Sequence, residues 1–546
     1  MPIEYDAVIV GGGHNGLVAA GYLARAGLRV VVLERRAVVG GPCSVLEYFP
    51  GYRGAFSNSP GSLEPKILRD LRLGEFGLEF VRPDPYVVHP FPEGRCFAAW
   101  RDRDRMVEHL AGFSARDARA YQDLLDDLQG FAARLGVSLF APPPPLRRVA
   151  SRLETAEDEE MFSKLMFGSI RDLVDERLES DEVKAVLVTL SLMSSMAGPR
   201  TPGTPLMLLH RPLALASRGR EPGYDPATLP LRGSTGLPRG GMGSITQAMR
   251  RSVEASGGDV RTQAPVAAIL VRDGRAAGAV LADGTQVRGR VVLSNLNPKT
   301  TLLQLVEPAC LSPEFRGRVG RLEMHGSQFK LGLALDGLPR FAAARTEEEA
   351  LGYAGCQFRI APSVDYMERA WDDARRGRWA RTPIMWGLTP SVTDPQLAPP
   401  GKHLMSVNIY HAPYRLGEGD WSVERDRFGR HCIDVLSQYI PNLKDLLIDY
   451  RVWSPKDLED ELGLLEANIT HGDMMPANMF AMRPMAGWSD YRTPVRGLYL
   501  CGVGTWPGGY VSGVPGHNGA HQVLADLREG VDEVFRRIAR EGRPGL

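Results

Sequence analysis

Four residues near the C-terminal end have side chains suited to chemistry. His471 and Asp473 lie two positions apart, and an imidazole beside a carboxylate can move a proton or orient a substrate. Trp506 and Tyr510 flank Pro507-Gly508-Gly509, where their rings could wall a planar cofactor. Each pair also has a structural alternative, a link between domains for the first and packing for the second. No triad or paired carboxylates stand beside them, as expected where a cofactor does the chemistry.

The N-terminal segment indicates how a cofactor would be held. Ala7–Val10 predict a buried strand, and three glycines follow it: Gly11, Gly13 and Gly16. The first allows a tight turn, the second lets the backbone approach a pyrophosphate, and the third lets the next helix pack against the strand. Val30–Leu33 predict a second strand, and Glu34 at its end can accept a hydrogen bond from a ribose. This order predicts a dinucleotide-binding unit.

Two further glycine loops favour FAD over NAD. Gly40-Gly41 follows the ribose-binding acid, as is common in glutathione-reductase-type flavoproteins. Residues 497–505 predict a short apolar strand ending in glycines, followed by a helix whose positive end would stabilise the N1/O2 edge of a reduced flavin. We therefore expect one FAD site built from both chain ends. The expected cofactor-binding residues are Gly11, Gly13, His14, Asn15, Gly16, Glu34, Arg35, Gly40, Gly41, Val266, Asn295, Gly502, Val503, Val511, Ser512 and Gly513.

A central glycine run resembles a second nucleotide fingerprint. Residues 240–243 read Gly-Gly-Met-Gly before an amphipathic helix, but no clean buried strand precedes them and no acid closes a second unit. A meander follows, with turns at Asp273-Gly274 and Asp283-Gly284. Its strands are expected at 268–271, 277–281, 286–287 and 291–295. We expect no second dinucleotide domain and no tightly bound NADPH.

Together these stretches resemble phytoene-desaturase-like flavoproteins, in particular the branch of bacterial carotene ketolases and animal pyridine nucleotide-disulphide oxidoreductase domain-containing proteins. The matching segments are 13–17, 33–36, 40–41, 240–243, 398–401, 471–474, 483–484, 498–502, 507–509 and 516–518. The resemblance runs almost end to end. It implies non-covalent FAD and an α/β fold, with a glutathione-reductase-type FAD-binding Rossmann domain interleaved with an α+β substrate domain.

The resemblance also implies domain boundaries. The discontinuous FAD-binding domain would comprise 1–75, 235–300 and 490–546, and the substrate domain with its helical lobe 76–234 and 301–489. The chain departs from its relatives at three places. Gly502-Val503-Gly504 replaces a segment that often holds an acid, His517 stands where an arginine is expected, and Trp506 where a histidine is frequent. The last two positions are expected near the flavin.

Composition excludes several classes of partner. Lysine plus arginine equals aspartate plus glutamate at 65 each, so no net field recruits nucleic acid. The 6 cysteines form no Cys-x-x-Cys motif, which excludes that type of redox disulphide and fits a reducing cytoplasm. His517 and His521 have metal-ligand spacing, but no further ligand is evident, so we expect no metal site.

An uncharged apolar run at 185–199 is too short to span a membrane. It predicts a core helix and loop, with a substrate tunnel lining or contact with a bilayer as alternatives. The start of the chain leads directly into the first strand without a signal peptide, so we expect a cytoplasmic protein, with peripheral membrane association as the alternative.

These observations predict an FAD-dependent oxidoreductase acting on an apolar small molecule. The first expectation is desaturation of an isoprenoid, carotenoid-like or polyketide-like substrate by hydride transfer to flavin N5, with oxygen or a quinone as electron acceptor. The alternatives are a ketolase-type oxidase and an amine or amino-acid oxidase, for which Arg359 or Arg415 could clamp a carboxylate. A flavin-fold binding protein is a third interpretation, against which the intact glycines and Glu34 argue.

Overall fold

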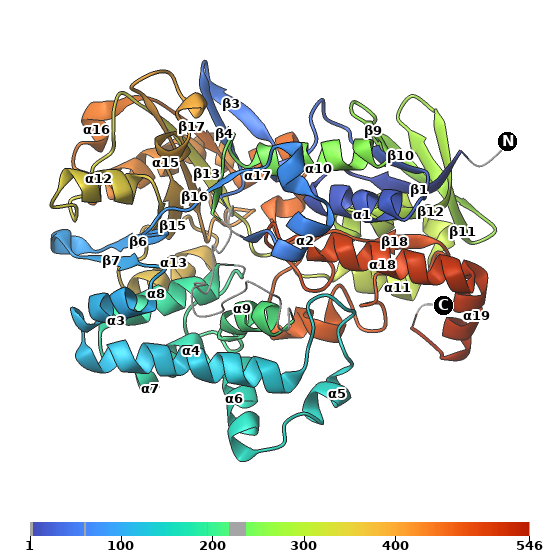
Figure 1. The fold of residues 1–546 in the computed structure, drawn as a ribbon, viewed down its shortest axis with the longest axis horizontal. Helices are drawn as coiled ribbons and strands as arrows, with labels where there is room; N and C mark the ends of the chain where they lie inside the picture. Colours follow the sequence, from blue (N-terminus) through green and yellow to red (C-terminus); the bar gives the residue numbers. More distant parts are fainter. Residues whose placement is uncertain (1–3, 59–61, 194, 218–235, 545–546) are drawn as a thin grey trace.

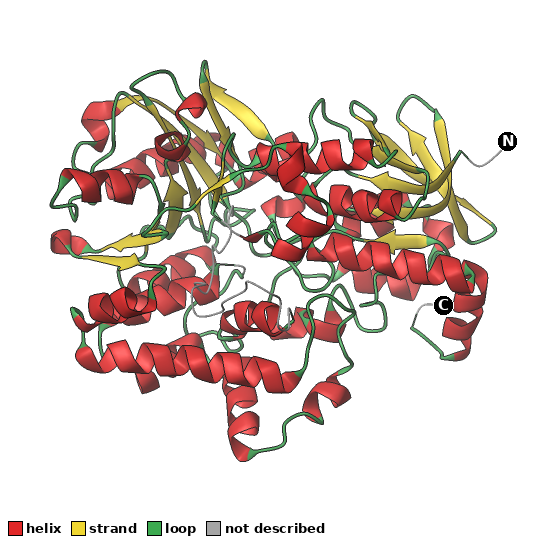
Figure 2. Ribbon diagram, in the orientation of Figure 1, coloured by secondary structure: helices red, strands yellow, loops and turns green. Residues whose placement is uncertain are grey.

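The computed structural model of the chain describes residues 4–58, 62–193, 195–217 and 236–544 (Figure 1). It contains two large β-sheets that lie side by side and a group of helices below the second of them (Figure 2). The two chain termini lie beside the first sheet (Figure 1).

The first sheet is built around parallel strands. Its order is β10-β11-β12-β1-β2-β9, and β18 also pairs with β12. The bounds are β1 Tyr5–Val10, β2 Val30–Leu33, β9 Asp259–Arg261, β10 Val266–Arg272, β11 Arg275–Leu281, β12 Gln286–Ser294 and β18 Leu498–Leu500. Four strands, β9, β2, β12 and β18, run parallel to β1 or to its neighbours, whereas β10 and β11 are antiparallel. Residues 7–10 of β1 and all of β2 are apolar runs buried on both faces, as is usual in parallel sheets.

The predicted meander is confirmed with one correction. Both hairpin turns occur where Asp273-Gly274 and Asp283-Gly284 predict them. The strands expected at 286–287 and 291–295 are one continuous strand, β12. The reason is that the two ends of β12 have different partners. Its first residues pair with β11, and its last residues, Val292–Ser294, pair with β1 and β18.

Three helices lie against the first sheet: α1 His14–Arg25, α10 Gly243–Ala255 and α18 Val514–Glu529. α1 contacts both of the others, so segments from the two ends and the middle of the chain pack together. Gly21 of α1 makes room for Leu71, which follows α2 (Pro65–Asp70), because a Cβ on Gly21 would lie 2.9 Å from the Leu71 side chain. The final helix, α19 Val531–Arg540, follows α18 at the edge of the molecule (Figure 1).

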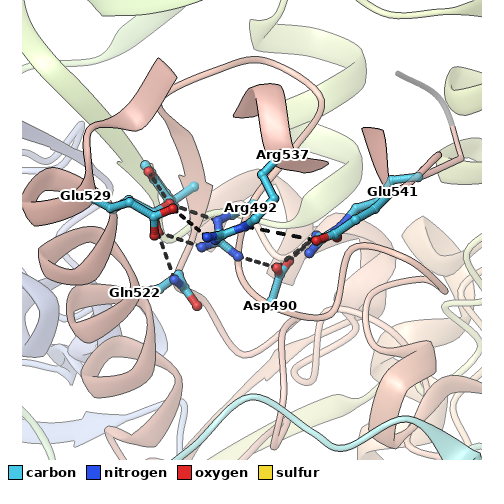
Figure 3. A network of polar contacts seen from close by, with 9 residues as sticks. Asp490, Arg492, Gln522, Glu529, Arg537 and Glu541 are labelled. Carbon is cyan, nitrogen blue, oxygen red and sulfur yellow. Dashed lines mark hydrogen bonds and ion pairs between the residues drawn. The ribbon is translucent and has the colours of Figure 1, made fainter. Parts of the chain in front are cut away.

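A buried ion pair anchors α18 to the loop before β18. Arg492 donates to the two carboxylate oxygens of Asp526 at 2.6 and 2.8 Å, and the Tyr499 hydroxyl donates to the same carboxylate at 2.8 Å. Asp490 pairs with Arg492 and with Arg543, which extends the network toward the C-terminus (Figure 3). These contacts fix the position of α18, whose N-terminal end faces α1.

The second sheet has the order β17-β13-β16-β15-β14-β6-β7. Its bounds are β6 Val87–Pro90, β7 Cys96–Ala99, β13 Phe329–Leu335, β14 Gln357–Ile360, β15 Met385–Leu388, β16 His403–Ile409 and β17 Leu447–Trp453. β13–β16 are almost entirely buried. The helices around it are α12 Glu347–Ala354, α13 Val364–Ala374, α14 Pro390–Thr393, α15 Trp421–Ser437, α16 Leu443–Leu446 and α17 Pro455–Leu462. α11 Pro313–Gly320 instead packs against the core of the first sheet through Phe315 and Val319. A hairpin of β3 Val45–Phe49 and β4 Tyr52–Ala55 contacts β16.

The helices below the second sheet form a lobe with its own apolar core. Their bounds are α3 Arg103–Ala111, α4 Ala115–Leu135, α5 Leu146–Ala150, α6 Ala156–Phe167, α7 Ile170–Arg177, α8 Asp181–Leu192 and α9 Leu206–Ala216. The uncharged run at 185–199 begins in α8, whose residues from Ala185 onward are buried. The expected core helix is therefore confirmed. Within the described residues, no helix is both long enough and apolar enough to cross a membrane.

Candidate cofactor and substrate site

A cavity of about 840 Å³, part of it open to solvent, lies between the two sheets. The turns after β1 and β2, strands β15 and β16, and loops after α17 and β18 all contribute to its wall. The lining residues are Gly13, His14, Gly40, Pro42, Cys43, Phe56, Ser57, Asn58, Met193, Asn295, Trp386, Asn408, Tyr410, Leu464, Ile469, Thr470, His471, Val503, Tyr510 and Val511.

The glycine turns at the cavity are packed so closely that a side chain would not fit. A Cβ on Gly13 would lie 2.5 Å from the side-chain nitrogen of Asn295, and one on Gly16 would lie 2.3 Å from a backbone oxygen of the same turn. Gly40 has a φ of +120°, and its N–H donates to Gly12 O at 2.8 Å. The two predicted glycine loops therefore form one connected backbone surface.

Two helix N-termini meet beside this surface. α1 begins at His14 without a side-chain cap, and a Cβ on Gly516 of α18 would lie 2.2 Å from Asn15 O. Both positive helix ends consequently lie at the same edge of the first sheet, which favours a bound anion such as a pyrophosphate. The side-chain nitrogen of Asn15 is buried without an acceptor among the described residues. A ligand oxygen would supply one.

Glu34 stands at the end of β2, as predicted, and is only 6% exposed. One carboxylate oxygen accepts from Gly12 N and the other from Arg36 N, both at 2.9 Å. Each oxygen retains a lone pair, so the carboxylate can also accept from a ribose hydroxyl. The glycine cradle, paired helix ends and oriented acid together fit FAD at this site.

The structure places the expected cofactor residues in two groups. Those that line the cavity are Gly13, His14, Gly40, Asn295, Val503 and Val511. Those outside its lining are Gly11, Asn15, Gly16, Glu34, Arg35, Gly41, Val266, Gly502, Ser512 and Gly513. Several of the second group shape the turns, whereas Arg35 is exposed and Val266 begins β10.

Two histidines at the cavity are neutral at physiological pH. Burial lowers the pKa of His14 to about 4 and that of His471 to about 3, and the nearby Arg483 charge adds to the shift of His471. His14 Nε2 and His471 Nδ1 are buried with no partner among the described residues. Of the two expected acid/base residues, only His471 reaches the cavity.

Asp473 lies behind the cavity wall. Its carboxylate accepts from Asn468 Nδ2 and Gly326 N at 2.8 Å, and it lies 3.0 Å from His325 Nδ1. The His325 pair lowers the pKa of Asp473 against the opposing effect of burial. Glu323, His325 and Asp473 could offer three ligand atoms to a metal, but the first two are exposed. The arrangement joins two loops rather than facing a substrate.

Of the two aromatic candidates, one lines the cavity and the other does not. Tyr510 lines the cavity and contacts His210, with ring centroids 4.9 Å apart. Trp506 is 1% exposed and stacks on Phe480 in the apolar core that includes the helical lobe. The His517 ring packs between other rings outside the cavity lining. Neither Trp506 nor His517 is among the residues that line the cavity.

Arg483 holds together the loops on one side of the cavity. It is 2% exposed, and its guanidinium donates to Val503 O at 2.7 Å, to Thr505 O at 3.3 Å and to the carbonyls of Thr470 and Gly472. Burial lowers the pKa of Arg483 to about 10, so it remains charged at neutral pH. It places a fixed positive charge behind the cavity wall.

A buried lysine lies behind the opposite wall. Lys330 Nζ donates to Asn408 Oδ1 at 2.7 Å, to Phe56 O at 3.0 Å and to Asn58 Oδ1 at 3.3 Å. All three acceptor residues line the cavity. Burial lowers the pKa of Lys330 well below its usual range, because no carboxylate accompanies it. This lowered pKa favours the neutral, basic form of the amine.

Strand register explains how Lys330 reaches this place. Lys330 pairs with Asn408, Asn408 with Trp386 and Trp386 with Arg359 across β13, β16, β15 and β14. Directly opposed residues share one face of a sheet, so these four side chains form a row toward the cavity side. Arg359 lies at its end with the guanidinium 5.5 Å from the Trp386 ring centre, and Arg415 is exposed. Neither arginine lines the cavity.

Sequence reasoning missed Lys330, Asn58, Asn408, Trp386 and Tyr410. They come from distant segments and carry no local motif. One signal was available, because Lys330 is the lone charged residue in the apolar strand Phe329–Leu335. A buried lysine in such a strand needs partners, which points to a site.

Comparisons with known proteins agree with this geometry. The sequence matches the flavin-containing amine oxidoreductase family over residues 227–516 and an NAD(P)-binding Rossmann-like domain over residues 9–57. Pyridine nucleotide-disulfide oxidoreductase domain-containing protein 2 of Mus musculus is 32% identical over 96% of this chain and 94% of its own length.

Two bacterial relatives are more distant. One of the two, from Castellaniella defragrans, is named as a subunit of limonene dehydrogenase and is 25% identical over 96% of this chain and 95% of its own. The lycopene-forming phytoene desaturase of a Paracoccus strain is 24% identical over 96% of this chain and 97% of its own. Among solved structures, an oxidoreductase from Methanosarcina mazei has a TM-score of 0.60 at 18% identity, covering 95% of this chain and 100% of that one. This last likeness shows the fold.

Proposed function

Because the chain belongs to the flavin-containing amine oxidoreductase family, whose cofactor is FAD, we propose that it desaturates a largely apolar substrate. The reacting part of that substrate is uncharged. Oxygen or a quinone accepts the electrons.

The observation that carries this proposal is the chemistry of the cavity wall. Among the described residues that line it, none is an aspartate, glutamate, lysine or arginine. The two histidines are neutral, and Arg483, which bonds to the lining residue Val503, is cationic. An ammonium group would enter this cavity without a counter-ion, at a high desolvation cost. An uncharged apolar group meets no such cost.

Apolar and aromatic side chains supply most of the remaining contacts. Phe56, Met193, Trp386, Tyr410 and Ile469 line the same cavity as the glycine turns. Such side chains can exclude water and hold a C–H bond in place. The names of two relatives, one from a limonene dehydrogenase and the other a phytoene desaturase, also support an isoprenoid substrate.

Bound FAD supplies the hydride acceptor, and the chain's own residues must handle the accompanying proton. Lys330 is suited to this task, since its lowered pKa leaves a basic amine connected to the cavity through Asn58 and Asn408. His471 is the second candidate, although its pKa near 3 makes it a weak base and a hydrogen-bonding group at neutral pH.

Anaerobic mixing of the purified holoprotein with two compound classes tests the proposal. We expect isoprenoid alkenes such as limonene to bleach the flavin absorption, and amines such as putrescine to leave it unchanged. Re-oxidation by oxygen or by a soluble quinone then identifies the acceptor class. Bleaching by amines alone would overturn desaturation and favour an amine oxidase, while a carbonyl product formed with oxygen would favour a ketolase-type oxidase.

A further inference from the structure

A second cavity adjoins the first. It contains about 450 Å³ of space, part of it open to solvent, and lies between the β3–β4 hairpin, the start of α10 and the segment that follows β15. Ser57 and Asn58 line both cavities, so the two meet at these residues. We call the second one the side cavity.

Many of the side chains that line the side cavity are apolar. They include Val45, Leu237, Met242, Leu388 and Leu397. Polar side chains in the wall, Asn58, Thr393 and Ser406, bond to protein partners.

Asn58 Nδ2 donates to Ser406 O at 2.9 Å, and Ser406 Oγ lies 3.1 Å from Asn58 Oδ1. Thr393 Oγ1 donates to Pro390 O at 3.1 Å. Because these polar groups already have partners, a ligand here gains little from hydrogen bonding and gains most from burying carbon. The side cavity therefore suits an apolar chain.

Arg53 is the exception in this wall. It lines the side cavity and is also exposed, so it marks the end that reaches solvent. Its neighbour across the hairpin is Glu47, whose carboxylate accepts from Gly51 N at 2.7 Å. Within the described chain no ion pair or hydrogen bond engages the Arg53 guanidinium. A cation at the mouth of an apolar cavity attracts an anionic head group.

We propose that the side cavity binds the far end of the substrate, and that this end is an apolar chain terminating in a carboxylate or phosphate paired with Arg53. The inference rests on the proposed function, because it assigns the reacting part of the same molecule to the main cavity. It narrows the substrate from any apolar compound to an amphipathic anion.

Binding of cis-parinaric acid, a fluorescent polyunsaturated fatty acid, to the FAD-loaded protein tests this assignment. We expect the acid to bind about fivefold more tightly than its methyl ester, the size of a partly exposed ion pair. Arg53→Gln should abolish that preference, whereas Arg119→Gln, an exposed arginine on α4, should keep it. Dodecanoate and dodecyl phosphate as competitors distinguish the two head groups, and inorganic phosphate alone should not compete.

Substitutions that fill the side cavity test whether the apolar chain binds there. Leu397→Trp should weaken both the acid and the ester more than tenfold, and the smaller change Val45→Phe serves if the first variant folds poorly. Equal binding of the acid and the ester by the wild type would contradict an anionic substrate end. An unaltered preference for the acid in Arg53→Gln would contradict its pairing with Arg53. Unchanged binding in both Leu397→Trp and Val45→Phe would show that the apolar chain does not occupy the side cavity. Because this experiment measures binding and not turnover, intact probe binding together with failure of isoprenoid alkenes to bleach the flavin would refute the proposed function alone.

Discussion

Replacement of Lys330 by methionine separates its structural role from its chemical one. The two side chains are similar in length, but methionine cannot donate to the three oxygens that Lys330 contacts. Asn58 Oδ1 keeps the Ser406 hydroxyl as a donor at 3.1 Å. Phe56 O and Asn408 Oδ1 lose their lysine donor, at about 1 kcal/mol each. We therefore expect the free energy of unfolding to fall by about 2 kcal/mol.

The effect on the reaction should be much larger than the effect on stability. A positioned base contributes roughly 100- to 10,000-fold to a rate, so anaerobic flavin reduction by the substrate should slow within that range. In the wild type that rate should rise with pH, because the neutral amine is the base and burial lowers its pKa. The variant should lack this rise.

Three measurements check this prediction: urea unfolding, flavin occupancy by absorbance, and rapid-mixing reduction at several pH values. Lys444→Met, at an exposed lysine on α16, is the matched control and should behave like the wild type. Normal reduction rates with an unchanged pH profile in Lys330→Met would refute a role for the lysine in proton handling. A loss of FAD from this variant would show instead that Lys330 supports the cofactor site.

The remaining predictions concern cofactor affinity and stability. Glu34→Ala should weaken FAD binding roughly tenfold or more, because a hydrogen bond to a charged acceptor contributes about 1.5–3 kcal/mol. Unaltered affinity in a fluorescence titration would show that Glu34 does not bind FAD. Asp526→Asn should lower the unfolding free energy by about 3 kcal/mol, since it leaves Arg492 buried without its bidentate partner, and an unshifted urea midpoint would contradict this. His325 has a raised pKa beside Asp473, so their pairing stabilises the fold fully below about pH 6.5 and is lost as pH rises through the raised value. The melting temperatures of wild type and His325→Gln should differ at low pH by a small amount, because the imidazole is exposed to solvent, and converge at high pH; a constant difference would contradict the linkage.

Local patterns in the sequence were sufficient for the cofactor half of the site. Gly13, Gly40 and Glu34 are placed by turns between adjacent elements, so their geometry follows from spacing along the chain. The paired helix ends could also be anticipated, because a glycine loop precedes each of them. The continuous strand β12 could not, since its length depends on partners from both halves of the sheet.

The substrate half depends on pairings that the sequence does not display. Lys330 and Asn408 become neighbours through strand register, and Asn58 joins them from a segment more than 270 positions away from Lys330. Proximity in sequence was also misleading. His471 and Asp473 are two residues apart, but the first lines the cavity and the second is bonded to His325 behind it.

The visible absorption spectrum of the purified protein, with identification of the released cofactor, tests the central claim most directly. The cavity with its glycine turns and paired helix ends predicts a flavin spectrum and FAD released on denaturation, one per chain. A colourless protein that cannot be reconstituted with FAD would contradict the account of the site and the proposed desaturation together.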